Sequence, residues 1–544
     1  MRHFVKRAAI VGGAVAVLAS LVASGYPNNS SYPNNSGYPS NNSNSNKAGN
    51  PSITSDWTLP GANLQNTRDV AGPINSSDVS KLGVAWTVPI TAGTGSGGYA
   101  TTPVVVNGVV YLQDLDSNVM AIQLATGKVL WTHTYDSPNG GPDGVNVVNG
   151  TVYAATASDV VALRASTGQQ LWSRSIISNV AEGIDMAPGY YRGTVYVSTV
   201  PTNATHPGYP PDTKGVLWAL NAATGAPEWT WDEVGDLWGN PSVNSGGGLW
   251  YPPSFDSQGN LYVGIANPGP GGGVPGYPWG TSRPGPNLYT DSVVKLSPQG
   301  KVLWYYQLTP HDLYDHDLQD SPMLTFADGQ PVVVAGGKGG IVIELDARTG
   351  RLLWSRPVGV HNGHDNDGLL TEFLSPTAPM PLPANVTVEP GEFGGIESQL
   401  ASDGTTAFAA VNDLATTYGS TTGPDLSNIG VALATATGEM VAVNQDNGQI
   451  AWDDQLPSSP YGGASITNDV VFTTTFNGYL YAFDTATGAV LLKTPLSAGS
   501  NAPVTIEGGY VIVGAAVPLS STQQPLIIAY KLGATGTLPD TVGS

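Results

Sequence analysis

The sequence predicts an all-β protein, an eight-bladed β-propeller with tryptophan-docking repeats whose ring is closed by N- and C-terminal strands. Three observations predict this fold. The 544 residues include 69 Gly and 43 Pro, and the short apolar runs are rich in Val, Tyr and Trp, which is typical of many strands joined by tight turns. A motif of strand, Gly turn and Trp recurs along the chain, and the two chain ends supply complementary parts of one further blade. One large repeat structure is therefore favoured over several ordinary domains.

Seven copies of the motif are visible, and AIQLATGKVLW, which ends at Trp131, is typical of them. Their turn glycines are Gly127, Gly168, Gly225, Gly300, Gly350, Gly448 and Gly488. Six copies end in tryptophan, at Trp131, Trp172, Trp229, Trp304, Trp354 and Trp452, and the seventh ends in Leu492. The shortest spacing between turn glycines is 40 residues, which fits one four-stranded blade, and longer spacings fit the same blade with inserted loops. One tryptophan at a fixed place in each blade indicates packing between neighbouring blades rather than chemistry.

The two ends of the repeat region predict how the ring closes. LGVAWTVPI, which contains Trp86, is typical of the fourth strand of a blade, but the first three strands of that blade do not precede it. The C-terminal segments APVTIEGGYVIVGAA and PLIIAYKLG are typical of the first three strands of a blade, and no fourth strand follows them. Pairing these pieces completes an eighth blade and leaves no exposed sheet edge at the junction.

The chain divides into four predicted parts. Residues 1–24 form a signal peptide, because Arg2, Lys6 and Arg7 precede an apolar run that ends in small residues. An uncleaved N-terminal anchor is the alternative. Residues 25–54 form a disordered linker rich in Asn, Ser, Pro and Gly, and residues 55–535 form the propeller. Residues 536–544 form a flexible tail.

Charge and cysteine usage exclude several classes of function. Charged residues make up 11% of the chain, with 41 acidic residues against 20 basic ones, so a nucleic-acid partner is excluded. The chain has no cysteine, which excludes disulfides, thiolate metal sites and c-type haem attachment. The signal segment predicts a secreted, periplasmic or cell-surface protein. The sparse, acidic surface also supports the hypothesis of an acidic habitat, in which the fold persists near pH 3.

The stretch Leu261–Asp317 differs from the repeats, because it combines an Asn-Pro turn, a Gly/Pro-rich loop and a cluster of acids and histidines. An Asn amide oxygen and a carboxylate brought together by consecutive strands of one blade are suitable ligands for calcium. A carboxylate beside the metal also suits the role of a base that accepts an alcohol proton. The cluster residues His311, Asp312, His316 and Asp317 are interpreted as side chains that hydrogen-bond within a polar turn.

The repeat resembles that of the quinoprotein dehydrogenase family, whose eight-bladed propellers carry an Ala-x-Asp-x-x-Thr-Gly-x-x-x-Trp motif and bind pyrroloquinoline quinone. The resemblance extends from Asp56 to about Leu532. YVGIANPGP resembles the family's Gly-Asn-Pro-x-Pro turn, which implies that Asn267 is a calcium ligand. YYQLTPHDLYDHD resembles the family's segment that ends in the catalytic base, which implies that Asp315 is that base and a calcium neighbour.

Further matches imply a cofactor pocket. GLWYPPSFD places Trp250 where the family stacks a tryptophan on the quinone, GGKGGIVIELD places Lys338 where a cation reaches the quinone oxygens, and PYGGASITNDVVFTTT places Tyr461 at a second aromatic wall. Glu182 in NVAEG lies at a suitable sequence distance from Asn267 to be the third metal ligand, although VYVSTVPTN competes for that position. The family's adjacent-cysteine ring is absent.

The resemblance implies a secreted dehydrogenase that uses pyrroloquinoline quinone and Ca²⁺ to oxidise an alcohol or sugar by hydride transfer. Its partners are then a small-molecule or polymeric alcohol and an external electron acceptor such as a cytochrome or quinone, because no haem motif is present. No stable membrane insertion is expected beyond the N-terminal anchor. The alternative is a non-catalytic propeller that acts as an extracellular binding or scaffold protein. Insertions at 203–214, 267–290 and 360–394 are expected to form loops over one mouth of the ring.

Overall fold

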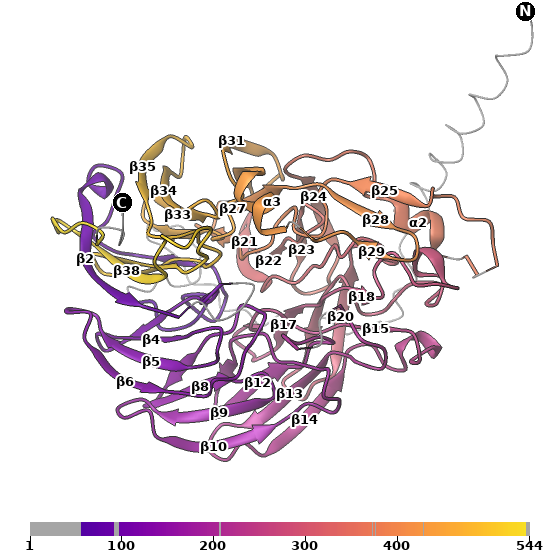
Figure 1. Ribbon diagram of the computed structural model, residues 1–544, viewed down its shortest axis with the longest axis horizontal. Helices are drawn as coiled ribbons and strands as arrows, with labels where there is room; N and C mark the ends of the chain where they lie inside the picture. The colour runs from indigo at the N-terminus through magenta and orange to yellow at the C-terminus, as the bar shows by residue number, and fades with distance from the viewer. Residues whose placement is uncertain are drawn as a thin grey trace, which may run out of the picture. The chain divides into compact units, whose positions relative to one another are not determined.

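The computed structural model describes residues 56–91, 97–205, 208–372, 374–375, 377–427 and 429–539 (Figure 1). The predicted signal peptide, the whole of the predicted linker and the end of the predicted tail lie outside these residues. Strands dominate, and the two α-helices described are α2 (Asp367–Thr371) and α3 (Ile429–Thr435). In the part of the chain that is described, no helix has the length and apolar character needed to cross a membrane.

The first four sheets are antiparallel meanders of four strands each. The first contains β3 (Val104–Val106), β4 (Val109–Gln113), β5 (Val119–Gln123) and β6 (Val129–His133). The second contains β7 (Asn146–Val148), β8 (Thr151–Ala155), β9 (Asp159–Arg164) and β10 (Gln170–Ser175). The third contains β11 (Gly189–Tyr191), β12 (Thr194–Ser198), β13 (Val216–Asn221) and β14 (Pro227–Asp232). The fourth contains β16 (Ser254–Phe255), β17 (Leu261–Gly264), β19 (Ser292–Leu296) and β20 (Val302–Gln307).

The remaining large sheets repeat the pattern. The fifth contains β21 (Met323–Ala327), β22 (Gln330–Ala335), β23 (Ile341–Asp346) and β24 (Leu352–Pro357). The sixth contains β26 (Ala401–Ser402), β27 (Thr406–Asp413), β30 (Thr437–Asn444) and β31 (Ile450–Leu456). The seventh contains β32 (Ser465–Thr467), β33 (Val470–Thr475), β34 (Tyr479–Asp484) and β35 (Val490–Pro495), and β1 (Asp69–Val70) extends it parallel to β32.

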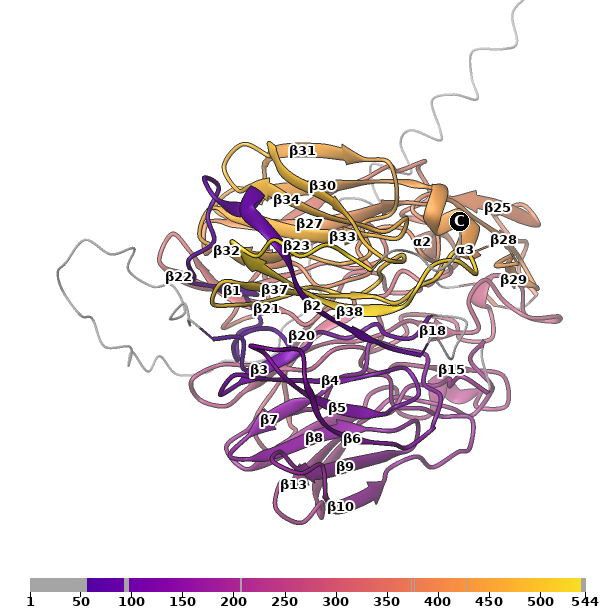
Figure 2. The same ribbon diagram turned by 60° about the vertical axis from the view of Figure 1, so that its left-hand side comes forward.

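The eighth sheet joins the two ends of the repeat region. It contains β36 (Thr505–Glu507), β37 (Tyr510–Ala515) and β38 (Leu526–Leu532) from the C-terminal part, and β2 (Leu82–Pro89) from the N-terminal part. β2 runs antiparallel to β38 from the pair Leu82 and Leu532 to the pair Pro89 and Leu526. Figures 1 and 2 both show indigo β2 beside yellow β38. This pairing covers an edge of β38 that would otherwise be exposed.

Tryptophans connect neighbouring sheets, except that the motif of the seventh sheet ends in Leu492. A methyl group at Gly168 would lie 2.6 Å from Cε3 of Trp131, so only glycine lets the ring pack this closely. Trp131 Nε1 also donates a hydrogen bond to the Ala165 carbonyl oxygen at 2.8 Å. The same ring-on-glycine contact occurs for Trp86 on Gly127, Trp172 on Gly225, Trp229 on Gly300, Trp304 on Gly350, Trp354 on Gly448 and Trp452 on Gly488. The motif tryptophans are therefore structural.

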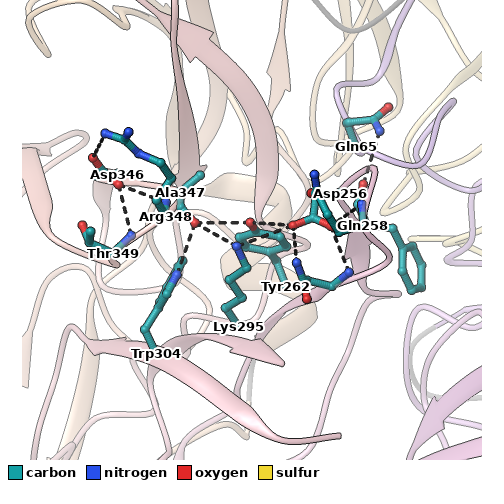
Figure 3. A network of polar contacts seen from close by, with 12 residues as sticks. Gln65, Asp256, Gln258, Tyr262, Lys295, Trp304, Asp346, Ala347, Arg348 and Thr349 are labelled. Carbon is teal, nitrogen blue, oxygen red and sulfur yellow. Dashed lines mark hydrogen bonds and ion pairs between the residues drawn. The ribbon is translucent and has the colours of Figure 1, made fainter. Parts of the chain in front are cut away.

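Figure 3 shows the polar contacts at one of these junctions, between the fourth and fifth sheets. The Ala347 carbonyl oxygen accepts hydrogen bonds from Trp304 Nε1, the Tyr262 hydroxyl and Lys295 Nζ, each at 3.2 Å. Lys295 also lies 3.5 Å from Asp256. One turn carbonyl thus joins three side chains of the preceding sheet, which strengthens the docking of the tryptophan.

The connections between strands fall at two ends of each sheet, because the strands alternate in direction. The short-turn end holds the connections between the first and second strands and between the third and fourth strands, none longer than five residues. The long-loop end holds the connections between the second and third strands and from each fourth strand to the next sheet. One of these, between β24 and β26, spans residues 358–400. The three insertions singled out in the sequence all belong to the long-loop end.

Two of these insertions pack together. Trp279 of the 267–290 insertion lies in η3 (Pro278–Gly280). It is fully buried in an apolar cluster that contains Val386 of the 360–394 insertion, together with Tyr314 and Tyr418. Tyr418 belongs to β28 (Thr416–Gly419), which pairs with β25 (Asn385–Val388) and β29 (Gly423–Pro424) in a small sheet. Other short elements are β15 (Ser245–Gly246), β18 (Pro268–Gly269), η1 (Val79–Lys81) and η2 (Leu237–Gly239). The loops therefore have a core of their own beside the Asp315 segment.

Candidate functional site

All of the residues proposed for the site from the sequence lie in connections of the long-loop end. They are Glu182, Trp250, Asn267, Asp315, Lys338 and Tyr461. The strands that precede and follow them belong to the second through seventh sheets. Residues far apart in the sequence thus reach one end of the fold, and the contacts below show which of them meet.

Lys338 forms ion pairs with two carboxylates at the centre of the site. Its Nζ lies 2.8 Å from Asp315 Oδ2 and 3.2 Å from Asp317 Oδ2. All three side chains are buried, with Asp317 fully enclosed. Asp315 and Asp317 therefore share a single ammonium group. When both acids are ionised, the three side chains together carry one net negative charge.

A tight turn places Asp315. The Asp312 carboxylate accepts hydrogen bonds from the backbone N–H groups of Tyr314 at 2.9 Å and His316 at 2.8 Å. Between them Asp315 adopts φ of 60°, a left-handed conformation that Asp tolerates better than most residues. The interpretation of Asp312 as a residue that hydrogen-bonds within the turn agrees with this geometry.

The glycines beside Lys338 explain how its side chain reaches the acids. The Lys338 N–H donates to the Asp317 carbonyl oxygen at 3.0 Å, so the two loops run against each other. A side chain at Gly337 would clash with that same carbonyl oxygen, and one at Gly336 would meet Ile396. The GGKGG sequence thus permits the close approach of β22–β23 to the Asp315 loop.

Asn267 joins the cluster through Asp317. Its backbone N–H donates to Asp317 Oδ1 at 2.6 Å, and its carbonyl oxygen accepts from the Gly247 N–H at 3.0 Å. The side-chain Oδ1 of Asn267 is buried and has no hydrogen-bond donor in the described structure. Asp317 is therefore the carboxylate that accepts a hydrogen bond from the Asn267 backbone.

Burial controls the electrostatics of the cluster. It raises the pKa of Asp315 well above its ordinary value, and Lys338 opposes this shift. Burial raises the pKa of Asp317 in the same way. Burial lowers the pKa of Lys338, but Asp315 and Asp317 outweigh it and raise the pKa well above the ordinary value. Lys338 therefore stays charged, and an additional cation would favour ionisation of both acids.

The oxygen atoms of the cluster fit a metal ion. Asn267 Oδ1 and Asp315 Oδ1 are buried without a hydrogen-bond partner, and Asp317 Oδ2 has only the ion pair with Lys338. Buried polar atoms are nearly always satisfied, so such atoms indicate a missing ligand. Among the described residues no three His, Asp or Glu side chains are grouped closely enough to hold a metal. The donor set here is instead two carboxylates and one amide oxygen, which suits a hard cation.

The other predicted site residues, Trp250, Tyr461 and Glu182, lie in connections other than those of the Lys338 cluster. The Trp250 ring is half-buried and its Nε1 has no hydrogen-bond partner. Tyr461 is half-buried and its ring lies 5.9 Å from that of Phe476. The Glu182 carboxylate accepts hydrogen bonds from the Ser178 and Asn179 N–H groups, at 2.8 and 3.1 Å, so its role as a metal ligand stays a prediction.

Several residues near Lys338 were not assigned a role from the sequence. Burial raises the pKa of Glu392 to about 7 and that of Glu397 to about 8, and Lys338 opposes both shifts. Burial and the charge of Asp315 raise the pKa of Tyr209 well above its ordinary value. Glu392 and Tyr209 lie in insertions without a pattern, whereas Asp317 was detectable from its spacing of two residues from Asp315.

Two family profiles match different segments of the chain. A profile described as the β-propeller domain of glucose, ethanol and alcohol dehydrogenases matches residues 182–396. A profile described as outer membrane protein assembly factor BamB matches residues 78–205 and 436–524. The first match contains Asn267, Asp315, Asp317 and Lys338.

Individual relatives are similar over most of the chain. It is 27% identical over 524 residues to a quinohemoprotein alcohol dehydrogenase of Comamonas testosteroni, a match that covers 83% of this chain and 70% of the relative. An alcohol dehydrogenase (quinone) subunit of Gluconobacter oxydans is 26% identical, and the chain spans less than half of its length, 46%.

Two solved structures show a similar fold. The quinohemoprotein alcohol dehydrogenase ADHIIG of Pseudomonas putida HK5 superposes with a TM-score of 0.76 at 21% identity, covering 90% of this chain and 82% of that one. A europium-containing methanol dehydrogenase superposes with a TM-score of 0.70 at 20% identity, covering 88% and 98%. The all-β class and the propeller fold predicted from the sequence are confirmed.

Proposed function

The chain belongs to the family of pyrroloquinoline quinone-dependent, alcohol dehydrogenase-like propellers, and on this premise we propose that it is a dehydrogenase that oxidises an alcohol or sugar. The observation that carries the proposal is the buried cluster of Asp315, Asp317 and Lys338 with the unpaired Oδ1 of Asn267. This cluster lies inside the segment that matches the dehydrogenase domain.

Asp315 supplies the base for the reaction. A bound quinone would supply the hydride acceptor for this oxidation, and a metal held by Asn267, Asp315 and Asp317 would supply a Lewis acid beside it. Asp315 takes the hydroxyl proton, so that the alcohol becomes a carbonyl compound. Lys338 holds Asp315 in position through the 2.8 Å contact and keeps a positive charge beside the developing alkoxide.

The metal ligands are proposed to be Asn267, Asp315 and Asp317, with Glu182 as a further candidate. Asp317 adds a carboxylate to Asp315 and Glu182, the two that the sequence assigned to the site. Ca²⁺ remains the proposed metal. The europium reported in a structural neighbour makes a trivalent lanthanide ion the second candidate, because an extra carboxylate favours a higher cation charge.

The proposed cofactor is held by three residues of this end. Trp250 and Tyr461 are half-buried aromatic side chains, as expected for walls that a planar quinone would cover. Lys338 is the nearby cation for the anionic groups of the quinone. Secretion through the 1–24 segment, and electron transfer to an external acceptor, complete the proposal.

The alternative is a non-catalytic propeller that binds or scaffolds other molecules outside the cell. The observation that favours it is the match of residues 78–205 and 436–524 to an assembly-factor profile. Those parts contain the tryptophan docking but none of Asn267, Asp315, Asp317 and Lys338. They also contain Glu182 and Tyr461, but the cluster that carries the proposal lies in the central segment.

The test is metal-dependent quinone binding. The purified protein, stripped of metal, is titrated with pyrroloquinoline quinone in the presence of Ca²⁺, Eu³⁺ or chelator, and binding is followed by the quinone absorption spectrum. We expect saturable binding of one quinone that requires a metal, followed by reduction of an artificial dye when a primary alcohol is added. No binding with either metal would refute the proposal and favour the non-catalytic propeller.

A further inference from the structure

The two ends of the sheets differ sharply in their numbers of acidic and basic residues. In the described residues, the connections of the short-turn end hold five acidic and five basic residues. The connections of the long-loop end hold 21 acidic residues and only three basic ones. The acidity of the chain is therefore concentrated at the end that carries the candidate site.

None of the three basic residues offsets this charge at the surface. Arg283 and Lys338 are buried, and Lys214 forms an ion pair with Asp232. Several carboxylates at this end are exposed, and they are Asp136, Asp212, Asp236 and Asp425. The surface around the site therefore presents negative charge without exposed, unpaired positive charge in the described connections.

The same end also exposes apolar side chains. Val180 is 77% exposed and Val431 is 67% exposed. Every exposed large apolar residue that lies in a described connection rather than a sheet strand belongs to the long-loop end, and they are Val180, Val360, Leu370, Val431 and Leu519. Exposed apolar side chains surrounded by polar and charged residues are typical of protein-binding surfaces.

Helix α3 connects this surface to the site. Its Leu433 is buried in an apolar cluster with Phe476, and Tyr461 packs against that cluster. Val431, in the same helix, faces solvent. A protein that contacts Val431 is thus separated from the proposed quinone wall Tyr461 by about one helix diameter, on the order of 10 Å.

We propose that the long-loop end is the docking surface for a cationic electron-acceptor protein. This rests on the proposed function, which needs an external acceptor. Oxidation of one alcohol leaves two electrons on the cofactor and two protons to be released. Two molecules of a one-electron acceptor, docked in turn, take the electrons while the protons pass to solvent. Opposite charge speeds such encounters and orients the partner, whereas the electrically balanced short-turn end offers no comparable attraction.

The test measures binding as well as turnover. The probe is mitochondrial-type cytochrome c, a basic protein, compared with the same cytochrome after succinylation has reversed the charge of its lysines. We expect the native cytochrome to bind at least about tenfold more tightly at low salt, and the difference to shrink at 0.5 M salt as screening increases.

Matched variants locate the surface. Asp236→Lys changes an exposed residue of the long-loop end, and Asp446→Lys makes the same charge change in an exposed turn of the short-turn end. We expect Asp236→Lys to weaken cytochrome binding several-fold and Asp446→Lys to leave it unchanged, with dye reduction unaltered in both. Equal effects of the two variants, or equal affinity for both cytochromes, would overturn the docking proposal. Charge-dependent binding without any dye reduction would support the docking surface and contradict the proposed dehydrogenase activity.

Discussion

The central segment and the segments that flank it use one strand repeat but differ in the connections at one end. In the first two sheets, the connections between the second and third strands are residues 114–118 and 156–158. In the third and fourth sheets the equivalent connections are residues 199–215 and 265–291. The tryptophan docking is the same in both regions. Stability and chemistry are therefore encoded in different parts of the repeat.

This difference matches the family comparison. The dehydrogenase profile contains the connections 199–215 (in part shared with the other profile) and 265–291, and the assembly-factor profile contains 114–118 and 156–158. A short connection has room for few additional side chains, and the five-residue connection 336–340 supplies one of them, Lys338. A long connection can carry an acid or amide to a shared site, because the strands below it fix where its ends lie. Four variants test how cleanly the two roles separate.

The largest effect is expected from Asp315→Asn in the central segment. The amide cannot accept the alcohol proton, so dye-linked turnover should fall by about a thousandfold. Quinone binding should persist, since the metal keeps Asn267 and Asp317. Stopped-flow and steady-state rates of the loaded protein measure the change, with Asp446→Asn as the control. A loss below about tenfold would remove Asp315 from the role of base.

Lys338→Met should cause the next largest effect, on stability. It leaves Asp315 and Asp317 buried without their cation, which costs about 3 kcal/mol in the free energy of unfolding. Urea unfolding of the metal-free protein measures this loss. Added Ca²⁺ should restore part of it by replacing the positive charge. The control is Lys128→Met in a flanking turn, where the change should stay within about 0.5 kcal/mol.

Trp131→Ala, in a flanking segment, should destabilise the fold by about 2 kcal/mol and leave chemistry unchanged. The variant loses the contact with Gly168 and the hydrogen bond to Ala165. Thermal unfolding and dye-linked activity per folded molecule are the measurements. If activity per folded molecule falls with stability, the separation of the two roles fails.

A pH dependence of stability is expected from Glu233, a buried carboxyl group outside the Lys338 cluster. Burial raises the pKa of Glu233 to about 8, although Ser198 donates a hydrogen bond to Oε1 at 2.8 Å. The folded state therefore holds this proton more tightly than the unfolded chain, whose pKa is about 4.3. Its stabilising contribution is complete below about pH 4.3 and is lost as the pH rises through about 8. The slope is at most about 1.4 kcal/mol per pH unit.

Glu233→Gln should flatten that dependence, and unfolding free energies at pH 5 and pH 8 measure it. Wild type should lose more stability than the variant between these values. An equal loss in both proteins would show that Glu233 is ionised throughout. Greater stability at pH 5 would also agree with the hypothesis of an acidic habitat.

The fold was predictable because its determinants are local. The Gly168 turn and the following Trp172 lie four residues apart, and this spacing recurs in the other copies. Trp86 also identified β2 as the fourth strand of a blade whose other strands lie at the C-terminal end of the repeat region. In the structure β2 pairs with β38. Such features need no knowledge of distant contacts.

The site was predictable only in part, because its contacts join separate loops. The resemblance assigned Asp315 and Lys338 to the site through two separate segments. The structure places Lys338 Nζ 2.8 Å from Asp315 Oδ2. The contact of Asn267 with Asp317 depends on how two loops approach each other, and the sequence assigned Asp317 only to turn hydrogen bonding. Tyr209 lies in an insertion whose course is set by packing alone, so no pattern identified it.

The most direct measurement is anomalous diffraction from crystals grown with pyrroloquinoline quinone and a lanthanide or calcium ion. The account predicts one strong metal peak about 2.4 Å from Asn267 Oδ1 and from carboxylate oxygens of Asp315 and Asp317. It also predicts quinone density between Trp250 and Tyr461. A metal bound elsewhere, or an Asp315–Lys338 cluster that stays unchanged with no quinone beside it, would contradict the account.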